Sequence, residues 1–259
     1  MAQPTDRALY LVQQPQLIVP TPEPQDAQPT RRWVYQLVSY QLSVPGGEVS
    51  RNDALWKRID EQAVDVATYD VLWKNGIRVG IAPIAEMEHV RRHIDDPAAK
   101  RLSTANTVQQ SFELPMGKEA QRQTIFWFDD QNVLRGRDFE ASRNVVNVNY
   151  RPTPRQPGHT RISLAPAVVG TRKEIRYTAM NREVEVTYEA PETFYDLNLR
   201  LDVPPGHFLI IAPSPEGRWP SSVGRAFFLR EDPQDLTEQV LVLVPNVFAQ
   251  DLRPVEPTP

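Results

Sequence analysis

Three residues with metal-binding side chains follow one another at helical spacing. His89 and His93 are one helical turn apart, and Glu86 lies one turn earlier. Two neutral imidazoles and a carboxylate are ligands that zinc and similar ions accept in proteins. The same spacing is typical of a solvated helix face, and the intervening Arg91 and Arg92 favour that interpretation. We therefore expect no bound metal and no cofactor.

A second group of candidate residues consists of Asp129, Asp130, Asp138 and Glu140. Paired carboxylates hydrolyse glycosides when they flank the scissile sugar bond. A turn explains Asp129 and Asp130 more simply, because aspartate side chains bond to the backbone of turns. The chain has no nucleophile elbow, phosphate loop or dinucleotide fingerprint. We expect no catalytic residue and no enzyme, and we keep a hydrolase as the least favoured alternative.

The other two histidines each follow a glycine. His159 comes after Gly158, and His207 comes after Gly206. Because glycine at such positions marks a turn, both histidines are predicted to be turn residues rather than general bases.

The tryptophans suggest binding rather than catalysis. Trp219 lies in a glycine-containing loop, where an exposed ring is a candidate contact for a protein partner or a sugar ring. The run Ile125–Phe128, which contains Trp127, puts aromatic side chains on both faces of one strand. It predicts either a buried central strand or an interface strand between subunits, since interface cores are rich in aromatics. Trp56 and Trp73 are predicted to pack into a small core.

The first half of the chain predicts a small α+β unit over residues 31–96. Alternating or apolar runs favour strands, and capping residues mark helix ends. The expected elements are a strand at Trp33–Val44, a helix capped by Ser50, a helix at Val66–Trp73 that ends at Asn75–Gly76, a strand at Ile77–Ile81, and a helix opened by Pro83. A boundary is expected at Asp95–Pro97, because the residue before proline leaves helical space.

The second half predicts a larger, mostly antiparallel β domain over residues 104–248. Candidate strands recur about every ten residues, as in a sandwich or curled sheet. They are Thr107–Leu114, Arg122–Phe128, Val133–Arg137, Asn144–Tyr150, Thr160–Pro166, Glu174–Thr178, Glu183–Tyr188, Leu197–Val203, Phe208–Ile211, the aromatic segment that ends in Phe227 and Phe228, and Val240–Val244. The continuous apolar runs Phe208–Ile211 and Val240–Val244 predict strands that are covered on both faces.

Composition narrows the class of protein. With 40% hydrophobic and 24% charged residues, the 259-residue chain can bury a sizeable core. A net charge of −4 gives no basic surface for nucleic acid, so we expect no nucleic-acid partner. Cysteine is absent, which excludes disulfides and thiolate ligands. No apolar run reaches the ~18 residues of a membrane helix.

The two ends of the chain are rich in proline. Residues 1–30 predict a flexible leader, with a docking strand as the alternative use of its apolar patches, and residues 249–259 predict a loose tail. The first residues show no charged and apolar leader pattern. We expect a cell-envelope or periplasmic location if a leader was removed, and a cytoplasmic one otherwise.

Several segments, taken in order, resemble the secretin family, whose members form ring-shaped gates in bacterial secretion systems. The resemblance spans about residues 122–248. It is carried by Val146–Pro154, Thr160–Val168, Leu199–Ile211 with its Val-Pro-Pro-Gly turn, Ser222–Phe228, and Leu241–Val247. The chain departs from the family at Pro205, where an acidic or amide residue is common. No pair of long amphipathic hairpins is recognised between Val169 and Phe194. The resemblance therefore implies a secretin-like sheet in a shortened or soluble relative.

These observations predict a non-enzymatic structural or assembly protein of the bacterial cell envelope. Secretin-like strands would associate with other copies of the chain or with other envelope proteins, through Trp127 and exposed strand edges. The alternative is a soluble β-sandwich module that binds carbohydrate or peptide through the loop Pro215–Ser222.

Overall fold

The computed structural model describes residues 30–94, 99–106, 108–177, 183–231 and 235–252. Residues 1–29, the predicted boundary at Asp95–Pro97 and residues 253–259 lie outside the described part. The pattern of contacts divides the chain into two units. One consists of the two ends, Met1–Arg31 and Asp251–Pro259, and the other is a body that spans Arg32–Gln250. The fold described here is that of this body.

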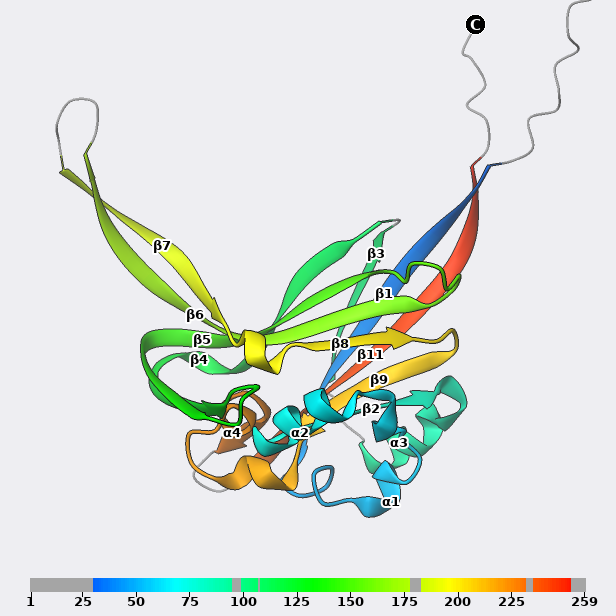
Figure 1. The fold of residues 1–259 in the computed structure, drawn as a ribbon, viewed down its shortest axis with the longest axis horizontal. Coiled ribbons are helices and arrows are strands. Elements are labelled where there is room, and N and C mark those ends of the chain that lie inside the picture. The colour runs from blue at the N-terminus through cyan, green and yellow to red at the C-terminus, as the bar shows by residue number, and fades with distance from the viewer. Residues whose placement is uncertain (1–29, 95–98, 107, 178–182, 232–234, 253–259) are drawn as a thin grey trace, which may run out of the picture. The chain divides into compact units, whose positions relative to one another are not determined.

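Two antiparallel sheets form the body (Figure 1). The first, sheet A, has the strand order β2-β9-β11-β1-β3, with β10 paired to β11. Its strands are β1 (Thr30–Pro45), β2 (Ile77–Pro83), β3 (Lys100–Asn106), β9 (His207–Pro213), β10 (Leu229–Glu231) and β11 (Leu236–Leu252).

The second sheet, sheet B, has the order β4-β5-β6-β7, with the short β8 paired to β6. Its strands are β4 (Gln110–Phe128), β5 (Leu134–Pro152), β6 (Thr160–Tyr177), β7 (Glu183–Thr193) and β8 (Leu199–Val203). The fold is therefore mostly antiparallel β with a few helices, as predicted.

The helices are short. They are α1 (Asp53–Trp56), α2 (Val66–Lys74), α3 (Met87–His93) and α4 (Val223–Phe228), with single 3₁₀ turns η1 (Glu61–Ala63), η2 (Ile84–Glu86), η3 (Tyr195–Leu197) and η4 (Pro215–Arg218). The α2 prediction was accurate, because Asp65 caps its start and Asn75 ends it.

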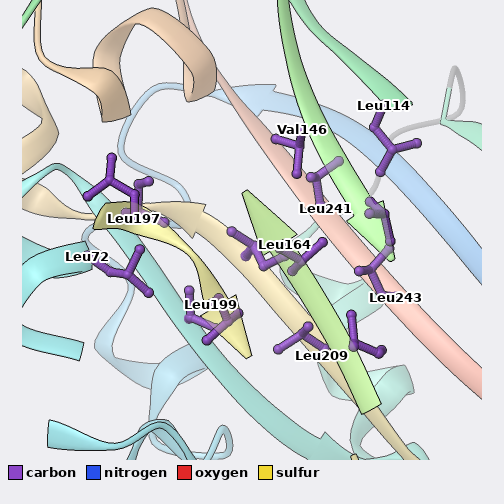
Figure 2. Close-up of a cluster of buried hydrophobic side chains, with 14 of the residues drawn as sticks. Leu72, Leu114, Val146, Leu164, Leu197, Leu199, Leu209, Leu241 and Leu243 are labelled. Carbon is purple, nitrogen blue, oxygen red and sulfur yellow. The ribbon is translucent and has the colours of Figure 1, made fainter. Parts of the chain in front are cut away.

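The main core lies between the two sheets. Leucine and valine side chains from β1, β9 and β11 meet those from β4, β5, β6 and β8 in one buried cluster. Figure 2 shows part of this cluster, including Leu209, Leu241 and Leu243 from sheet A together with Val146 and Leu164 from sheet B. This contact between inward faces is how a β-sandwich is stabilised.

Sheet A is buried on its other face as well. A second cluster joins Phe208, Ile210, Val240 and Val242 to side chains of α1 and α3, including Leu55, Trp56 and Val90. The prediction that the runs at Phe208–Ile211 and Val240–Val244 are covered on both faces is confirmed.

Strands from residues 31–96 do not form a sheet of their own. β1 pairs with β3 and lies beside β11, and β2 pairs with β9. The N-terminal strands and the C-terminal strands therefore share sheet A. Local patterns predict strands, but they do not reveal which distant strand is the neighbour.

The turn Pro204–Gly206 lies between two strands, as predicted. These strands belong to different sheets, since β8 pairs in sheet B and β9 in sheet A. The turn therefore carries the chain from one sheet to the other. The burial pattern agrees, since β8 alternates between buried and partly exposed residues whereas β9 is buried almost throughout.

One predicted strand is a helix. The aromatic segment before β10 forms α4, whose first turn is capped by Ser222 through a bond from the Arg225 amide at 3.2 Å. Val223, Phe227 and Phe228 are all buried in the main core. Apolar residues at i and i+4 after a serine are a helix signal that the aromatic character concealed.

Other differences concern where elements begin and end. Asn52, rather than Ser50, caps α1. The strands predicted at Thr107–Leu114 and Arg122–Phe128 join into β4, which has register shifts between Met116 and Gln123 and so bends without ending. The polar stretch before it contains β3, which was not predicted.

The region between Val169 and Phe194 contains a long hairpin, whose outer strands were predicted at Glu174–Thr178 and Glu183–Tyr188. β6 and β7 pair from Ala167 opposite Thr193 to Tyr177 opposite Glu183. The length of this pairing was not predicted, because the outer residues are exposed and carry mixed charge on both faces.

Candidate functional site

A surface hollow of about 700 Å³ is lined by aromatic residues at the end of α2, the end of β4 and η4. We call it the aromatic hollow and define it by Trp73, Lys74, Phe128, Asn132, Leu134, Glu216 and Trp219. It contains Trp219, the loop tryptophan that sequence analysis singled out as a contact. Glu216 belongs to the same loop, whereas the other five residues come from segments distant in the sequence, so no local pattern could have grouped them with Trp219.

The aromatic rings of this hollow are only partly buried. Trp219 was predicted to be exposed, but it is half-buried and its ring lies 6.1 Å from that of Phe128 at an angle of 57°. Trp73 was predicted to lie in the core, yet it too is half-buried and lines the hollow. Tyr69 stacks on Trp73 at 5.8 Å and supports it.

A buried asparagine positions the main chain of Phe128. The Asn75 side chain donates to the carbonyl of Phe128 at 2.9 Å and accepts from the amide of the same residue at 2.8 Å. This pair of bonds ties the end of α2 to the end of β4, and Asn75 is fully buried. The Asn-Gly pair indicated only a helix end, so this second role was not predicted.

The rim of the aromatic hollow is polar. The Lys74 ammonium donates to the Asn132 side-chain oxygen at 3.1 Å, and Glu216 is exposed on the opposite segment. Asn132 adopts a left-handed backbone with φ of 61°, which asparagine tolerates better than most residues. The rim therefore offers hydrogen-bond donors and acceptors.

The Asp129 side chain bonds to the backbone of a turn, which is the role favoured for it from the sequence. Its carboxylate accepts from the amides of Val133 at 2.7 Å and Gln131 at 3.0 Å, and pairs with Arg135 at 2.8 Å. The bond from the Val133 amide is the main cause that lowers the pKa of Asp129, and Arg135 lowers it further. This buried carboxylate stabilises the β4–β5 turn.

Asp138 and Glu140 of the hydrolase hypothesis do not join Asp129. Asp138 accepts from the Thr124 hydroxyl at 2.5 Å, and Glu140 lies 3.7 Å from Arg122. Asp129 and Asp130 both line a second hollow that adjoins the aromatic one, and neither Asp138 nor Glu140 lines it. The two aspartates of the turn are thus separate from the other two carboxylates.

The histidine motif does not assemble into a metal site. Glu86 bonds to Arg58 at 3.3 Å, while the His89 ring faces the carbonyl of Ala54 at 3.2 Å. The His89 and His93 rings lie 4.7 Å apart edge to face. Within the described part of the chain, no three histidine, aspartate or glutamate side chains are placed to hold a metal ion.

His159 lies in the loop between β5 and β6, as expected of a turn residue, whereas His207 is the first residue of β9. The His207 ring lies 3.1 Å from the carbonyl of Pro205. The backbone amide of His159 donates to Gln156 at 3.1 Å and closes the loop between β5 and β6.

Trp127 lies on an edge strand rather than a central one. β4 has β5 on one side, and on the other side it forms only a single bridge, between Phe126 and Ser222, within the described residues. The Trp127 ring is half-buried, packs edge to face on Phe194 at 4.9 Å, and donates to Asp196 at 3.2 Å.

Sheet B also has open edges along two of its longest strands. β5 pairs with β6 only from Ser142 to Pro152, and β6 pairs with β5 only as far as Gly170. Beyond that point β6 pairs with β7 alone. In the described part of the chain, Leu134–Ala141 of β5 and Thr171–Tyr177 of β6 therefore each have a neighbouring strand on one side only, and Figure 1 shows the β6–β7 hairpin diverging from the rest of the sheet.

None of the helices among the described residues combines the length and hydropathy needed to cross a bilayer. Comparisons of this chain with protein-family models, with curated proteins and with solved structures found no match.

Proposed function

We propose that this protein is a non-enzymatic structural or assembly protein of the bacterial cell envelope that associates with copies of itself through the open edges of sheet B. The observation that carries the proposal is the β6–β7 hairpin. Its outer part has two strands and no further strand on the β6 side, within the described residues.

A two-stranded hairpin is marginally stable in water by itself. The outer hairpin exposes Ile175, Val184 and Tyr188, each more than two-fifths accessible. Its charged pairs, such as Lys173 with Glu185, are exposed and contribute little stability. An added strand from a neighbouring copy would satisfy the open backbone groups of β6 and bring its side chains beside Ile175.

Exposed strand edges in monomeric proteins are normally short, bulged or rich in lysine. The open segment of β6 has seven residues from Thr171 to Tyr177 and pairs continuously with β7 without a register shift. Its main-chain groups are a template for hydrogen bonding with another chain, whose side chains must match the charges of Arg172, Lys173, Glu174 and Arg176. The secretin-like order of segments supports the same proposal.

The test is the mass of the protein in solution, measured by light scattering after size exclusion over a range of micromolar concentrations. We expect a uniform multimer. A variant in which residues 173–187 are replaced by Asn-Gly keeps Arg172 opposite Tyr188 across a two-residue turn, and should be monomeric. A wild-type protein that remains monomeric at every concentration would overturn the proposal.

A matched pair of substitutions distinguishes association through the strand edge from nonspecific association. Ile175→Lys places a charge on the open strand, whereas Tyr195→Lys places one on η3, where the side chain is 79% exposed. We expect Ile175→Lys to shift the multimer towards monomer and Tyr195→Lys to leave its mass unchanged. Equal effects of the two would count against an edge-mediated assembly.

A further inference from the structure

We propose that the aromatic hollow binds a saccharide ring, in a site that is independent of the self-association proposed above. Three side chains with large rings, Trp73, Phe128 and Trp219, line one open depression and keep part of their surface accessible. The C–H groups of a sugar ring pack on such aromatic surfaces, whose electron-rich faces attract the positive hydrogen edge.

The rings have protein contacts before any ligand arrives. The main chain of Phe128 is held by both polar atoms of the Asn75 side chain, Trp73 rests on Tyr69, and Trp219 rests against Phe128. A preorganised site loses little side-chain entropy on binding, which favours affinity for a small ligand.

The polar rim matches hydroxyl groups. A sugar hydroxyl both donates and accepts, so it needs donors and acceptors at short range. Lys74 and Asn132 supply donors, and the exposed Glu216 carboxylate supplies an acceptor. Lys74, Phe128 and Asn132 also line the adjoining hollow, where Asp70 and Asp130 add acceptors for a second ring.

The charges around the hollow select among ligands. Lys74 is the one cation among the residues that line these two hollows in the described part of the chain, against the carboxylates of Glu216, Asp70, Asp129, Asp130 and Asp196. Such a surface repels phosphates, acidic sugars and acidic peptides. The chain's own Pro20–Pro24 segment contains Glu23 and is disfavoured for that reason. A neutral or amino-bearing saccharide is the ligand class that fits.

The test uses the full chain with its five tryptophans labelled as 5-fluorotryptophan, which gives one fluorine signal for each ring. The probes are soluble oligomers of glucose, mannose, N-acetylglucosamine and glucosamine, added separately up to millimolar concentration. We expect at least one of them to shift the Trp73 and Trp219 signals in a saturable way, while the Trp33 signal, from a side chain 54% exposed on β1, stays fixed. No saturable shift with any of the four oligomers would overturn the proposal.

Two substitutions test the site itself. Trp219→Ala should weaken binding about tenfold or more, and Glu216→Gln, which removes only charge, should weaken it less. Trp33→Ala is the matched control, because it removes an exposed tryptophan elsewhere. Thermal unfolding of each variant checks that it is folded. If Trp219→Ala lowers the unfolding midpoint, the weaker binding of Glu216→Gln and the selective shift of the Trp73 signal test the saccharide site instead.

Titration with a peptide tests the alternative ligand class, a proline-rich peptide. A peptide with the sequence of residues 18–26 should leave the Trp73 and Trp219 signals unchanged. A saturable shift of both signals by this peptide, with none by the sugars, would identify the hollow as a proline-rich peptide site and refute the saccharide assignment.

Discussion

Glu238 shows how much one side chain contributes at the scale of the residue. It is 2% exposed, and its two oxygens accept from the amides of Gly47, Val49 and Ser50 and from the Ser50 hydroxyl, at 2.5 to 2.9 Å. A carboxylate can satisfy four donors because it carries only acceptors. The turn after β1 is therefore stabilised by a residue far along the chain.

Replacing this carboxylate by an amide should destabilise the fold. In Glu238→Gln, one side-chain oxygen becomes an NH₂ group that faces backbone donors. We expect the free energy of unfolding to fall by about 3 kcal/mol, since hydrogen bonds to charged groups are each worth about 1.5 to 3 kcal/mol. Urea denaturation measures this change. Glu48→Ala, in the same turn but exposed, is the control and should change stability little.

Asp129 predicts a pH dependence. Its pKa is lowered in the native state, first by the Val133 amide and then by Arg135. The native carboxyl therefore binds its proton less tightly than the unfolded one, whose pKa is about 3.9. The stability that it contributes is present above that unfolded pKa and is lost as pH falls through the lower native pKa.

Asp129→Asn should remove part of this acid sensitivity. The variant should be less stable than the wild type at neutral pH, because it loses the ion pair with Arg135. The difference between the two unfolding midpoints should shrink as the pH is lowered from about 5 to about 2. Thermal melts across this range measure it, with Asp130→Asn as an exposed neighbouring control. A difference that grows at low pH would contradict the assigned role.

The role of a residue could be predicted from the sequence where that role depends on neighbouring residues. The turn role of Asp129 follows from its own neighbours, and Asn75–Gly76 was correctly assigned as the end of a helix. The second partners of Asn75 and Glu238 lie 53 and about 190 residues away. No pattern near either residue indicates such a partner, so these roles could not be predicted.

At the scale of the element, Gly224 explains how α4 can pack closely against the turn after α2. Its amide donates to the carbonyl of Asn75 at 2.7 Å, so the helix lies directly against the turn after α2. A Cβ added at this glycine would come within 2.3 Å of the carbonyl oxygen of Gly76. The close approach of two backbones requires a residue without a side chain.

Gly224→Ala should therefore be destabilising although alanine is the better helix former. Propensity alone favours alanine by about 1 kcal/mol, whereas overpacking against a rigid backbone costs about 1 to 3 kcal/mol or more. We expect a net loss of about 2 kcal/mol, measured by denaturant unfolding. Gly170→Ala is the control, since its Cβ would meet only Ser142 at an ordinary 3.9 Å. A stabilised Gly224→Ala variant would contradict the packing described.

A helix or strand could be predicted when its own sequence carries a clear pattern. The buried runs in β9 and β11 indicate strands by composition, and α2 carries signals at both ends. The outer strands of the β6–β7 hairpin were also predicted, but the full length of their pairing was not. That length depends on the partner strand, which the periodicity of one strand does not reveal.

At the scale of the whole molecule, the fold class was predictable and the arrangement was not. Frequent short apolar runs indicated a mostly antiparallel β protein, and the body is a sandwich of two sheets. The grouping of β1 and β2 with β9 and β11 could not be derived, because it brings strands together across most of the chain. The aromatic hollow depends on that grouping, so only Trp219 among its residues was singled out as a contact.

The Glu238 contact also has a consequence for the order of events during synthesis. Its carboxylate lies 191 residues after Gly47, whose amide it accepts from. At ~5 to 20 residues per second, a ribosome needs roughly 10 to 40 seconds to make the intervening chain. Until then β1 lacks β11 beside it and the turn lacks its acceptor. Sheet A can therefore close only near the end of translation, and β1 must be kept from wrong partners while it waits.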